Sequence, residues 1–413
     1  MASGAPHTNG NAHPIAPLDA SRLKVQLAET LKPIPPQGSY GFGDIKTDHM
    51  LIMTYDPLTG WSAPEIKPYA PLSLDPASNC FQYCTNVFEG MKALLDPQGR
   101  PCMFRPKDNM ARLVTSAARM ALPPFDPEAL LVCISKLVFI ESRWIPSLPG
   151  HSLYIRPTMI GTKPSIKVGA SDYATLYTIV TPVGPYFPTT SGGVSLLAVG
   201  EHVRSWPGGT GGFKLGLNYS PGFVPQRAAA ALGYDQVLWL LGKEKLITEA
   251  GAMNFFAVVE RADGGVDVVT PPLDGTILPG ITRDAALVLL RAHAADPSKG
   301  ILVLPADLKI NVEERELSVR ELAAWAKTGR LAECFGTGTA VLVVAIERIG
   351  DVADADPEAL AEAANPDVKT PPVVDIEMKA GRGLGAVGTA LWDKLLALKE
   401  GRDDFQGWSV LCE

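Results

Sequence analysis

The sequence lacks the features that would place it among membrane or nucleic-acid-binding proteins. No stretch of about 18 or more apolar residues occurs, so we expect no membrane-spanning helix. The formal net charge is -7, which gives no general basis for binding nucleic acid or an anionic membrane surface. We therefore expect neither nucleic acid nor a membrane among the partners.

Cysteine is scarce, with six residues in 413. Only Cys80 and Cys84 lie close together, and no Cys-x-x-Cys occurs. This pattern favours reduced thiols in an intracellular protein over a disulfide framework or a zinc site, so we expect no metal. The first 36 residues lack an apolar signal core and contain one arginine, Arg22. We expect a cytoplasmic protein and leave a mitochondrial location open.

What is present is enough apolar sequence for more than one core. At roughly 100–200 residues per domain, the length suggests two or three domains. Residues 184–193 are rich in proline and glycine and mark the best boundary. We predict a flexible N-terminal arm (1–37), a small α+β domain (38–184), an interdomain loop (185–193) and a large domain (194–413).

Periodicity predicts both helices and strands, without the regular alternation of a doubly wound sheet. The predicted strands include 152–161, 174–183, 194–199 and 236–241, and the predicted helices are 107–122, 127–143, 282–295 and one that begins at a capping box at Ser318. The fold class predicted from this mixture is α+β in two domains, with no internal repeat.

Four segments have compositions that suit a chemical site. They are 212–221 around Lys214, 246–256 around Glu249, 275–283 at the start of a helix, and 335–340 before a strand. Free N–H groups and the dipole at a helix start favour a phosphate. Taken singly, each segment has an ordinary explanation, such as a solvated lysine or a tight turn.

Together the four segments resemble the branched-chain aminotransferases, which belong to the fold type IV pyridoxal phosphate enzymes. The resemblance includes 88–93, 104–112, 153–157 and 184–188, in family order from about residue 38 to 350. An ordered set of motifs is far more specific than any one of them. The resemblance implies a two-domain fold with pyridoxal 5'-phosphate between the domains.

The resemblance also implies individual roles. Lys214 would form the Schiff base, Glu249 would face the pyridine nitrogen, and Tyr219 would lie beside the ring oxygen. The positions matching phosphate ligands are Arg105, Ile281, Thr282 and Thr339, and those matching the substrate pocket are Phe88, Tyr154, Arg156, Tyr186, Thr339, Ala340 and, from a partner subunit, Tyr83. A site shared in this way implies a homodimer.

The implied activity is reversible transfer of the amino group of L-leucine, L-isoleucine or L-valine to 2-oxoglutarate by a ping-pong mechanism. Such an enzyme needs a lysine to hold the aldehyde and to move a proton, and a cofactor that absorbs the electrons left on Cα. The alternatives are a D-amino-acid or (R)-amine transaminase, an aminodeoxychorismate lyase, or a branched-chain paralogue specialised for a secondary pathway. Tyr83, the run 88–92, Tyr154 and Arg156 favour the branched-chain group over the first three.

Three residues depart from the family pattern. Ala252 stands where many members have threonine, which removes a hydroxyl near the substrate. Val341 and Val344 stand where some mammalian members have a redox-active cysteine pair, so we predict no such thiol switch.

Two other functions have some support in the sequence. The run Gly383-Leu-Gly-Ala-Val-Gly388 matches G-x-G-x-x-G and raises an NAD-dependent dehydrogenase. That assignment needs a complete βαβ unit, and the short C-terminal tail leaves no room for one. A non-catalytic binding protein is the third possibility, and the presence of Lys214, Glu249, Tyr219 and Arg105 argues against it.

Overall fold

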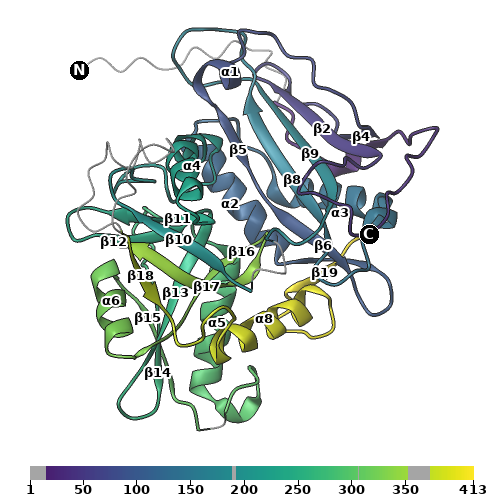
Figure 1. Cartoon of the computed structure of the whole chain (residues 1–413). Helices are drawn as coiled ribbons and strands as arrows, with labels where there is room; N and C mark the ends of the chain where they lie inside the picture. The colour runs from purple at the N-terminus through teal and green to yellow at the C-terminus, as the bar shows by residue number, and fades with distance from the viewer. Residues whose placement is uncertain (1–14, 188–191, 306, 352–372) are drawn as a thin grey trace, which may run out of the picture.

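The strands form two sheets that occupy separate parts of the molecule (Figure 1). The computed structural model describes residues 15–187, 192–305, 307–351 and 373–413. Helices lie against both sheets, so the predicted α+β class is confirmed. In the described residues no helix is long and apolar enough to cross a membrane.

The first sheet belongs mainly to the N-terminal half. Its main path runs β1-β4-β2-β9-β8-β6-β7-β19, where β19 is Ser409–Leu411, with β3 paired to β2 and β5 paired to β8. Its elements from the N-terminal half are β1 (Lys24–Val25), β2 (His49–Asp56), β3 (Gly60–Trp61), β4 (Glu65–Pro68), α1 (Asn79–Tyr83), β5 (Asn86–Phe88), β6 (Met91–Leu95), β7 (Pro101–Phe104), α2 (Pro106–Arg119), α3 (Pro127–Ile140), β8 (Ser152–Gly161) and β9 (Ala174–Val183).

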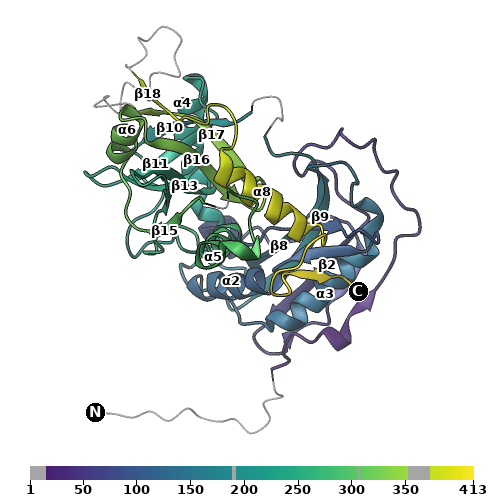
Figure 2. The same ribbon diagram turned by 90° about the horizontal axis from the view of Figure 1, so that it is seen from below.

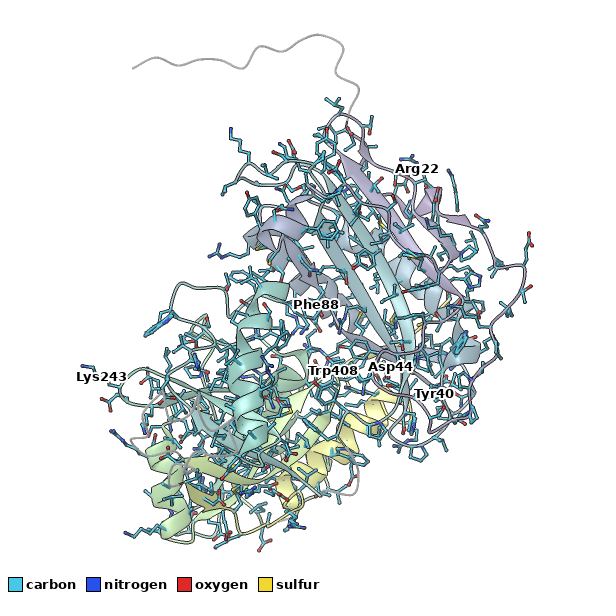
Figure 3. All side chains as sticks on the ribbon, turned by 45° about the horizontal axis from the view of Figure 1, so that its top comes forward. Arg22, Tyr40, Asp44, Phe88, Lys243 and Trp408 are labelled. Atoms are coloured by element: carbon cyan, nitrogen blue, oxygen red, sulfur yellow. The ribbon has the colours of Figure 1, made fainter. Side chains whose placement is uncertain are left out.

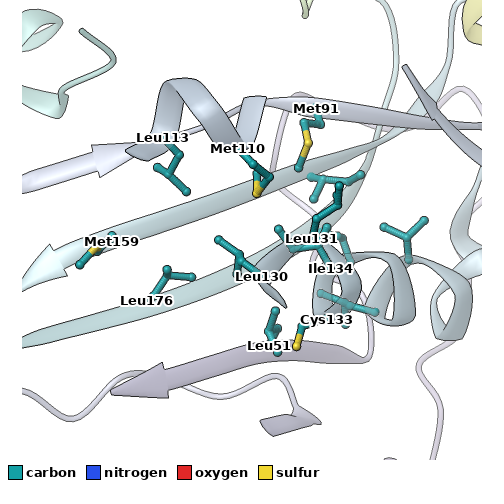
Figure 4. Packing of buried hydrophobic residues seen from close by; sticks show 14 of the residues in the cluster. Leu51, Met91, Met110, Leu113, Leu130, Leu131, Cys133, Ile134, Met159 and Leu176 are labelled. Carbon is teal, nitrogen blue, oxygen red and sulfur yellow. The ribbon is translucent and has the colours of Figure 1, made fainter. Parts of the chain in front are cut away.

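Helices α2 and α3 cover one face of this sheet. Proline begins each helix, where its missing N–H has no intrahelical partner to lose. One apolar cluster contains Leu113 and Ile134 from the helices and Leu51 and Leu176 from the strands, and all four are fully buried (Figure 4). This apolar contact supplies the main stabilising energy of the first domain.

The second sheet closes into a small barrel. Its main path is β12-β11-β10-β17-β16-β13-β14-β15, and an additional pairing of β12 with β13 closes the ring. Its elements are β10 (Val194–Val199), α4 (Phe223–Ala231), β11 (Gln236–Leu241), β12 (Leu246–Ala250), β13 (Met253–Glu260), β14 (Val266–Thr270), α5 (Ile281–Ala295), β15 (Ile310–Glu314), α6 (Val319–Lys327), β16 (Leu331–Gly338), β17 (Leu342–Asp351), β18 (Val374–Glu377) and α8 (Ala386–Lys399). The predicted capping box at the start of α6 is confirmed, because Ser318 and Glu321 exchange hydrogen bonds there.

The C-terminus departs from the predicted domain division. After α8 the chain forms β19 (Ser409–Leu411), which pairs antiparallel with β7 of the first sheet. Helix α8 contacts both β17 and β7, and Figure 2 shows it lying between the two sheets. The range 194–413 is therefore not one spatial unit, because its last strand completes the first sheet.

The N-terminal segment also differs from expectation where it is described. Strand β1 pairs in parallel with β4, and Leu18 is buried in the core of the first domain. Residues 15–37 therefore attach to the small domain, because they supply apolar and backbone contacts that the composition alone did not indicate. The rest of the predicted arm, 1–14, and part of the interdomain loop, 188–191, lie outside the described residues.

Candidate active site

A cavity of about 310 Å³ is lined by residues from both sheets, and we call it the main cavity. All the predicted site residues except Arg105 and Tyr83 line it. They are Phe88, Tyr154, Arg156, Tyr186, Lys214, Tyr219, Glu249, Ile281, Thr282, Thr339 and Ala340. Figure 3 labels Phe88 near the junction of the two parts of the chain. These residues come from segments far apart in the sequence, and the fold places them around one space.

The backbone of Lys214 is hydrogen-bonded to residues of the first domain. Its N–H donates to Ser116 Oγ at 2.9 Å, and its carbonyl accepts the Phe88 N–H at 3.2 Å. Its ammonium group contacts Tyr219 Oη at 3.3 Å and lies 5.0 Å from the centre of the Phe88 ring. No carboxylate of the described residues lies within ion-pairing distance of Lys214 Nζ. The Lys214 amine is therefore held in position without an ion-pair partner among the described residues.

Glu249 is a buried acid with a buried arginine beside it. Its side chain is 3% exposed, and its Oε2 lies 2.5 Å from Nε of Arg204. Burial raises the pKa of Glu249, and the charge of Arg204 opposes that rise most strongly. Sequence reasoning missed Arg204, which lies in the irregular segment before Lys214 and belongs to no recognised motif.

The same carboxylate fixes the start of α5. Glu249 Oε1 accepts the Leu278 N–H at 3.2 Å, while the Asn254 side chain donates to the Leu278 carbonyl at 2.9 Å. Helix α5 begins after Gly280 with no side-chain cap, so its first N–H groups keep their hydrogen-bonding capacity. Ile281 and Thr282 stand at this end and line the main cavity. The arrangement suits an anion.

A second buried ion pair supports the wall of the main cavity. Glu89 and Arg112 form two hydrogen bonds, of 2.7 and 2.8 Å, and Glu89 is fully buried. Burial alone would raise the pKa of Glu89, but Arg112, together with Lys214 and Asn109, holds the pKa below its usual value. Arg112 also donates to the Pro279 carbonyl at 2.9 Å, which ties α2 to the loop before α5.

Arg105 and Tyr83 lie outside the main cavity. The Arg105 guanidinium contacts Asp108 and Asp284, each at 2.7 Å, and stacks on Trp408. Its Nη1 is buried without a hydrogen-bond partner, so one donor remains for another acceptor. The Tyr83 hydroxyl donates to the Ile166 carbonyl. The predicted phosphate role of Arg105 and the predicted cross-subunit role of Tyr83 stay predictions.

Aromatic rings form the apolar part of the main cavity. Phe42 packs edge-on against Tyr154 and Tyr186, with centroid distances of 5.0 Å to each. The guanidinium of Arg156 lies over Phe88 at 4.8 Å, and its buried Nε has no partner. Sequence reasoning missed Phe42, because it lies in an irregular segment and only the fold brings it to these tyrosines.

The three departures from the family pattern lie close to this site. Ala252 and Val341 line the main cavity. Val344 faces a neighbouring cavity. All six cysteines are free thiols in the structure, and the described residues include no cluster that could hold a metal.

The glycine-rich run at the start of α8 has a structural explanation. The buried carboxylate of Glu333 accepts the N–H groups of Gly385 at 2.8 Å, Val387 at 2.9 Å and Gly388 at 3.1 Å. A Cβ at Gly388 would lie 2.6 Å from Glu333 Oε2, so the carboxylate requires glycine there. The helix start that a dinucleotide would need is filled by this side chain.

Comparison with known proteins identifies the family. Residues 86–349 match the family model described as amino-transferase class IV. The chain is 42% identical to the mitochondrial branched-chain-amino-acid aminotransferase of Schizosaccharomyces pombe, over 96% of this chain and 86% of that protein. The chain belongs to the class IV aminotransferases, as the motifs predicted. Within that class it is a homologue of branched-chain-amino-acid aminotransferases.

Two further matches agree with this result. The chain is 44% identical to the cytosolic branched-chain-amino-acid aminotransferase of Saccharomyces cerevisiae, over 81% of this chain and 87% of that one. Its fold is similar to the crystal structure of the T.th. branched-chain amino acid aminotransferase complexed with N-(5'-phosphopyridoxyl)-L-glutamate. The TM-score is 0.62 and the identity 21%, over 88% of this chain and 98% of that chain. This likeness confirms the predicted fold type.

Proposed function

We propose that the chain transfers the amino group of L-leucine, L-isoleucine or L-valine reversibly to 2-oxoglutarate, with pyridoxal 5'-phosphate bound in the main cavity. The observation that carries the proposal is the set of groups around that cavity. Lys214 presents an amine with no carboxylate partner among the described residues, Tyr219 contacts it at 3.3 Å, and Glu249 is a buried acid. The identity to branched-chain-amino-acid aminotransferases supports the same activity.

The residues present fit this cofactor. When bound, pyridoxal phosphate supplies an aldehyde for the amino group and a ring that absorbs electrons from Cα. The uncapped start of α5, with Thr282, and the unpartnered Nη1 of Arg105 are donors suited to its phosphate. Glu249 as an anion would hold a proton on the ring nitrogen, and Arg204 favours that ionised form.

The chain's own groups then have distinct tasks. Lys214, whose amine contacts Tyr219 at 3.3 Å, would take the proton from the substrate Cα and return it in the reverse half of the exchange. The aromatic group of Phe42, Tyr154 and Tyr186 suits a branched apolar side chain. Arg156, whose Nε lacks a partner, suits the second carboxylate of 2-oxoglutarate or glutamate.

A spectroscopic experiment tests this proposal. The purified holoenzyme should be yellow, lose that colour with L-leucine and regain it with 2-oxoglutarate. Replacement of Lys214 by alanine should abolish turnover. Indifference to the three branched-chain L-amino acids together with reaction towards D-alanine would overturn the substrate assignment, and full activity of Lys214→Ala would overturn the mechanism.

Arg156 offers a sharper test of how one cavity accepts two substrates. In Arg156→Met the KM for 2-oxoglutarate should rise more than the KM for L-leucine, because only the former carries a second carboxylate. An equal rise for both substrates would assign Arg156 to a general structural role.

We also propose a homodimer, with Tyr83 completing the site of the partner subunit. Tyr83 does not line the main cavity of its own chain, and Phe81, Ile166 and Val168 nearby are 60–79% exposed. An apolar exposed edge of this kind is typical of an interface. Sedimentation should show a dimer, and Tyr83→Ala should alter substrate KM. A monomer with full activity would contradict this.

The compartment stays a prediction. Relatives of the chain carry both mitochondrial and cytosolic designations. Our expectation is cytoplasmic, and fractionation of cells expressing the full chain would decide between the two.

A further inference from the structure

A second cavity of about 200 Å³ adjoins the main cavity and contains two lysines, which also line a small pocket beside Ile281, Thr282 and Thr339. It lies between β6, the turn before β17 and helix α8. Tyr186, Phe187, Ala340 and Val341 line both cavities and form the wall between them. The lysines are Lys92 on β6 and Lys399 at the end of α8.

These two ammonium groups lack counter-charges. Neither has a carboxylate within 4.0 Å among the residues that the structure describes. Lys92 donates to the Ala340 carbonyl at 2.7 Å. Lys399 is 6% exposed and lies over the Phe104 ring at 5.5 Å. Burying an ammonium group without an anion costs free energy. An anion that binds beside the two lysines would reduce this cost.

The electrostatics agree with this geometry. Burial lowers the pKa of Lys399 to about 7, and repulsion by Lys92 contributes. Burial likewise lowers the pKa of Lys92 to about 8. A bound anion would favour both charged forms, because an opposite charge nearby stabilises an ammonium.

The rest of the lining determines what kind of anion fits. Apart from the lysines and the polar pair His151 and Ser152, it is mainly apolar, with Leu94, Pro185, Leu342, Val343, Val344, Trp392 and Leu396. Its volume lies below the range usual for drug-sized ligands. The ligand should therefore be small and combine one anionic group with an apolar body.

We propose that the second cavity binds a short-chain carboxylate with an apolar body, whose carboxylate is held by Lys92 and Lys399. The contact between Lys92 and the Ala340 carbonyl connects this site to the turn at Thr339 and Ala340. If the proposed function holds, that turn receives the substrate's α-carboxylate. An acid in the second cavity then competes with the Ala340 carbonyl of the turn for Lys92.

Calorimetric titration of the holoenzyme with 4-methylpentanoate tests the proposal, while cofactor absorbance reports the main cavity separately. The parent should bind two equivalents of 4-methylpentanoate per chain, one in each cavity. Lys399→Met should bind one equivalent, in the main cavity. Lys399→Arg, which keeps the charge, should bind two, as should Lys327→Met, which removes an exposed lysine on α6. Inorganic phosphate should give no heat from the second cavity, because it lacks an apolar part.

Each outcome of the titration either supports or contradicts the proposal. Equal numbers of bound equivalents in the parent and in Lys399→Met would overturn the proposal. Saturable binding of inorganic phosphate in the second cavity would overturn the requirement for an apolar body. Lys399→Met should fold and melt at a higher temperature than the parent, since it removes a buried unpaired charge. Should it not fold, Lys92→Met must show the same loss of one equivalent. An absent absorbance response to L-leucine would count against the proposed function and leave this count unaffected.

Discussion

The buried pair of Arg204 and Glu249 allows a quantitative test of the site. Their side chains are 6% and 3% exposed and 2.5 Å apart. Replacing Arg204 by methionine leaves the Glu249 carboxylate without its cation, and breaking a buried pair in this way costs about 3–5 kcal/mol. For a domain of 150–250 residues, each kcal/mol shifts the melting temperature by about 2–4 °C, so Arg204→Met should melt on the order of 10 °C lower.

The same variant should change the pH dependence of turnover. Burial raises the pKa of Glu249, and Arg204 is the strongest influence that lowers it. Without Arg204 the pKa rises further, so the carboxylate takes up a proton at a higher pH. Activity that depends on the anion is lost as the pH falls through this pKa, and the acid limb of the kcat profile should therefore move to higher pH.

A double variant separates stability from catalysis. Arg204→Met with Glu249→Gln removes both charges, so the melting temperature should recover while turnover remains low. Arg204→Lys keeps a positive charge and should fall between the parent and Arg204→Met. If Arg204→Met melted with the parent and kept its pH profile, the reasoning about this pair would be wrong.

Three further outcomes are expected. Tyr219→Phe removes the hydroxyl at 3.3 Å from Lys214 Nζ, worth about 0.5–1.5 kcal/mol, and should lower kcat by up to about tenfold, with KM as the control. Glu333→Ala leaves the N–H groups at the start of α8 without their acceptor, at a cost of about 1–3 kcal/mol, and should lower the melting temperature while cofactor colour is retained. Hydrogen peroxide should not inhibit through a disulfide near Val341, because that turn has no cysteine pair. Cys334 is the nearest cysteine in sequence, and burial raises the pKa of its thiol. A reversible loss of activity tied to an internal disulfide would contradict this.

Local sequence patterns predicted many elements well. The strands at 152–161, 174–183, 194–199 and 236–241 occur with the predicted bounds, and the capping box at Ser318 is formed. These elements depend on alternation of apolar residues and on side-chain contacts within a few positions. Such signals survive in the sequence because both partners lie close along the chain.

The family and the lysine predicted to bear the cofactor were also accessible from the sequence, although not from the chemistry of single residues. Lys214 stands in an irregular segment that, alone, would suit a surface lysine. The ordered set of motifs identified it, and the fold places it in the main cavity with Glu249 and Tyr219. Its role in catalysis is a prediction that the Lys214→Ala variant tests.

The sequence by itself determined the class of the protein, most of its strands and helices, and the segments that carry the site. Only the tertiary structure placed Arg204 against Glu249, Phe42 against Tyr154, and Lys399 beside Lys92 in a second cavity. It also returned the C-terminal strand β19 to the first sheet. The physical reason is that ion pairs, ring packing and strand pairing between distant segments depend on distance in space, and no local periodicity or propensity records which distant residues will meet.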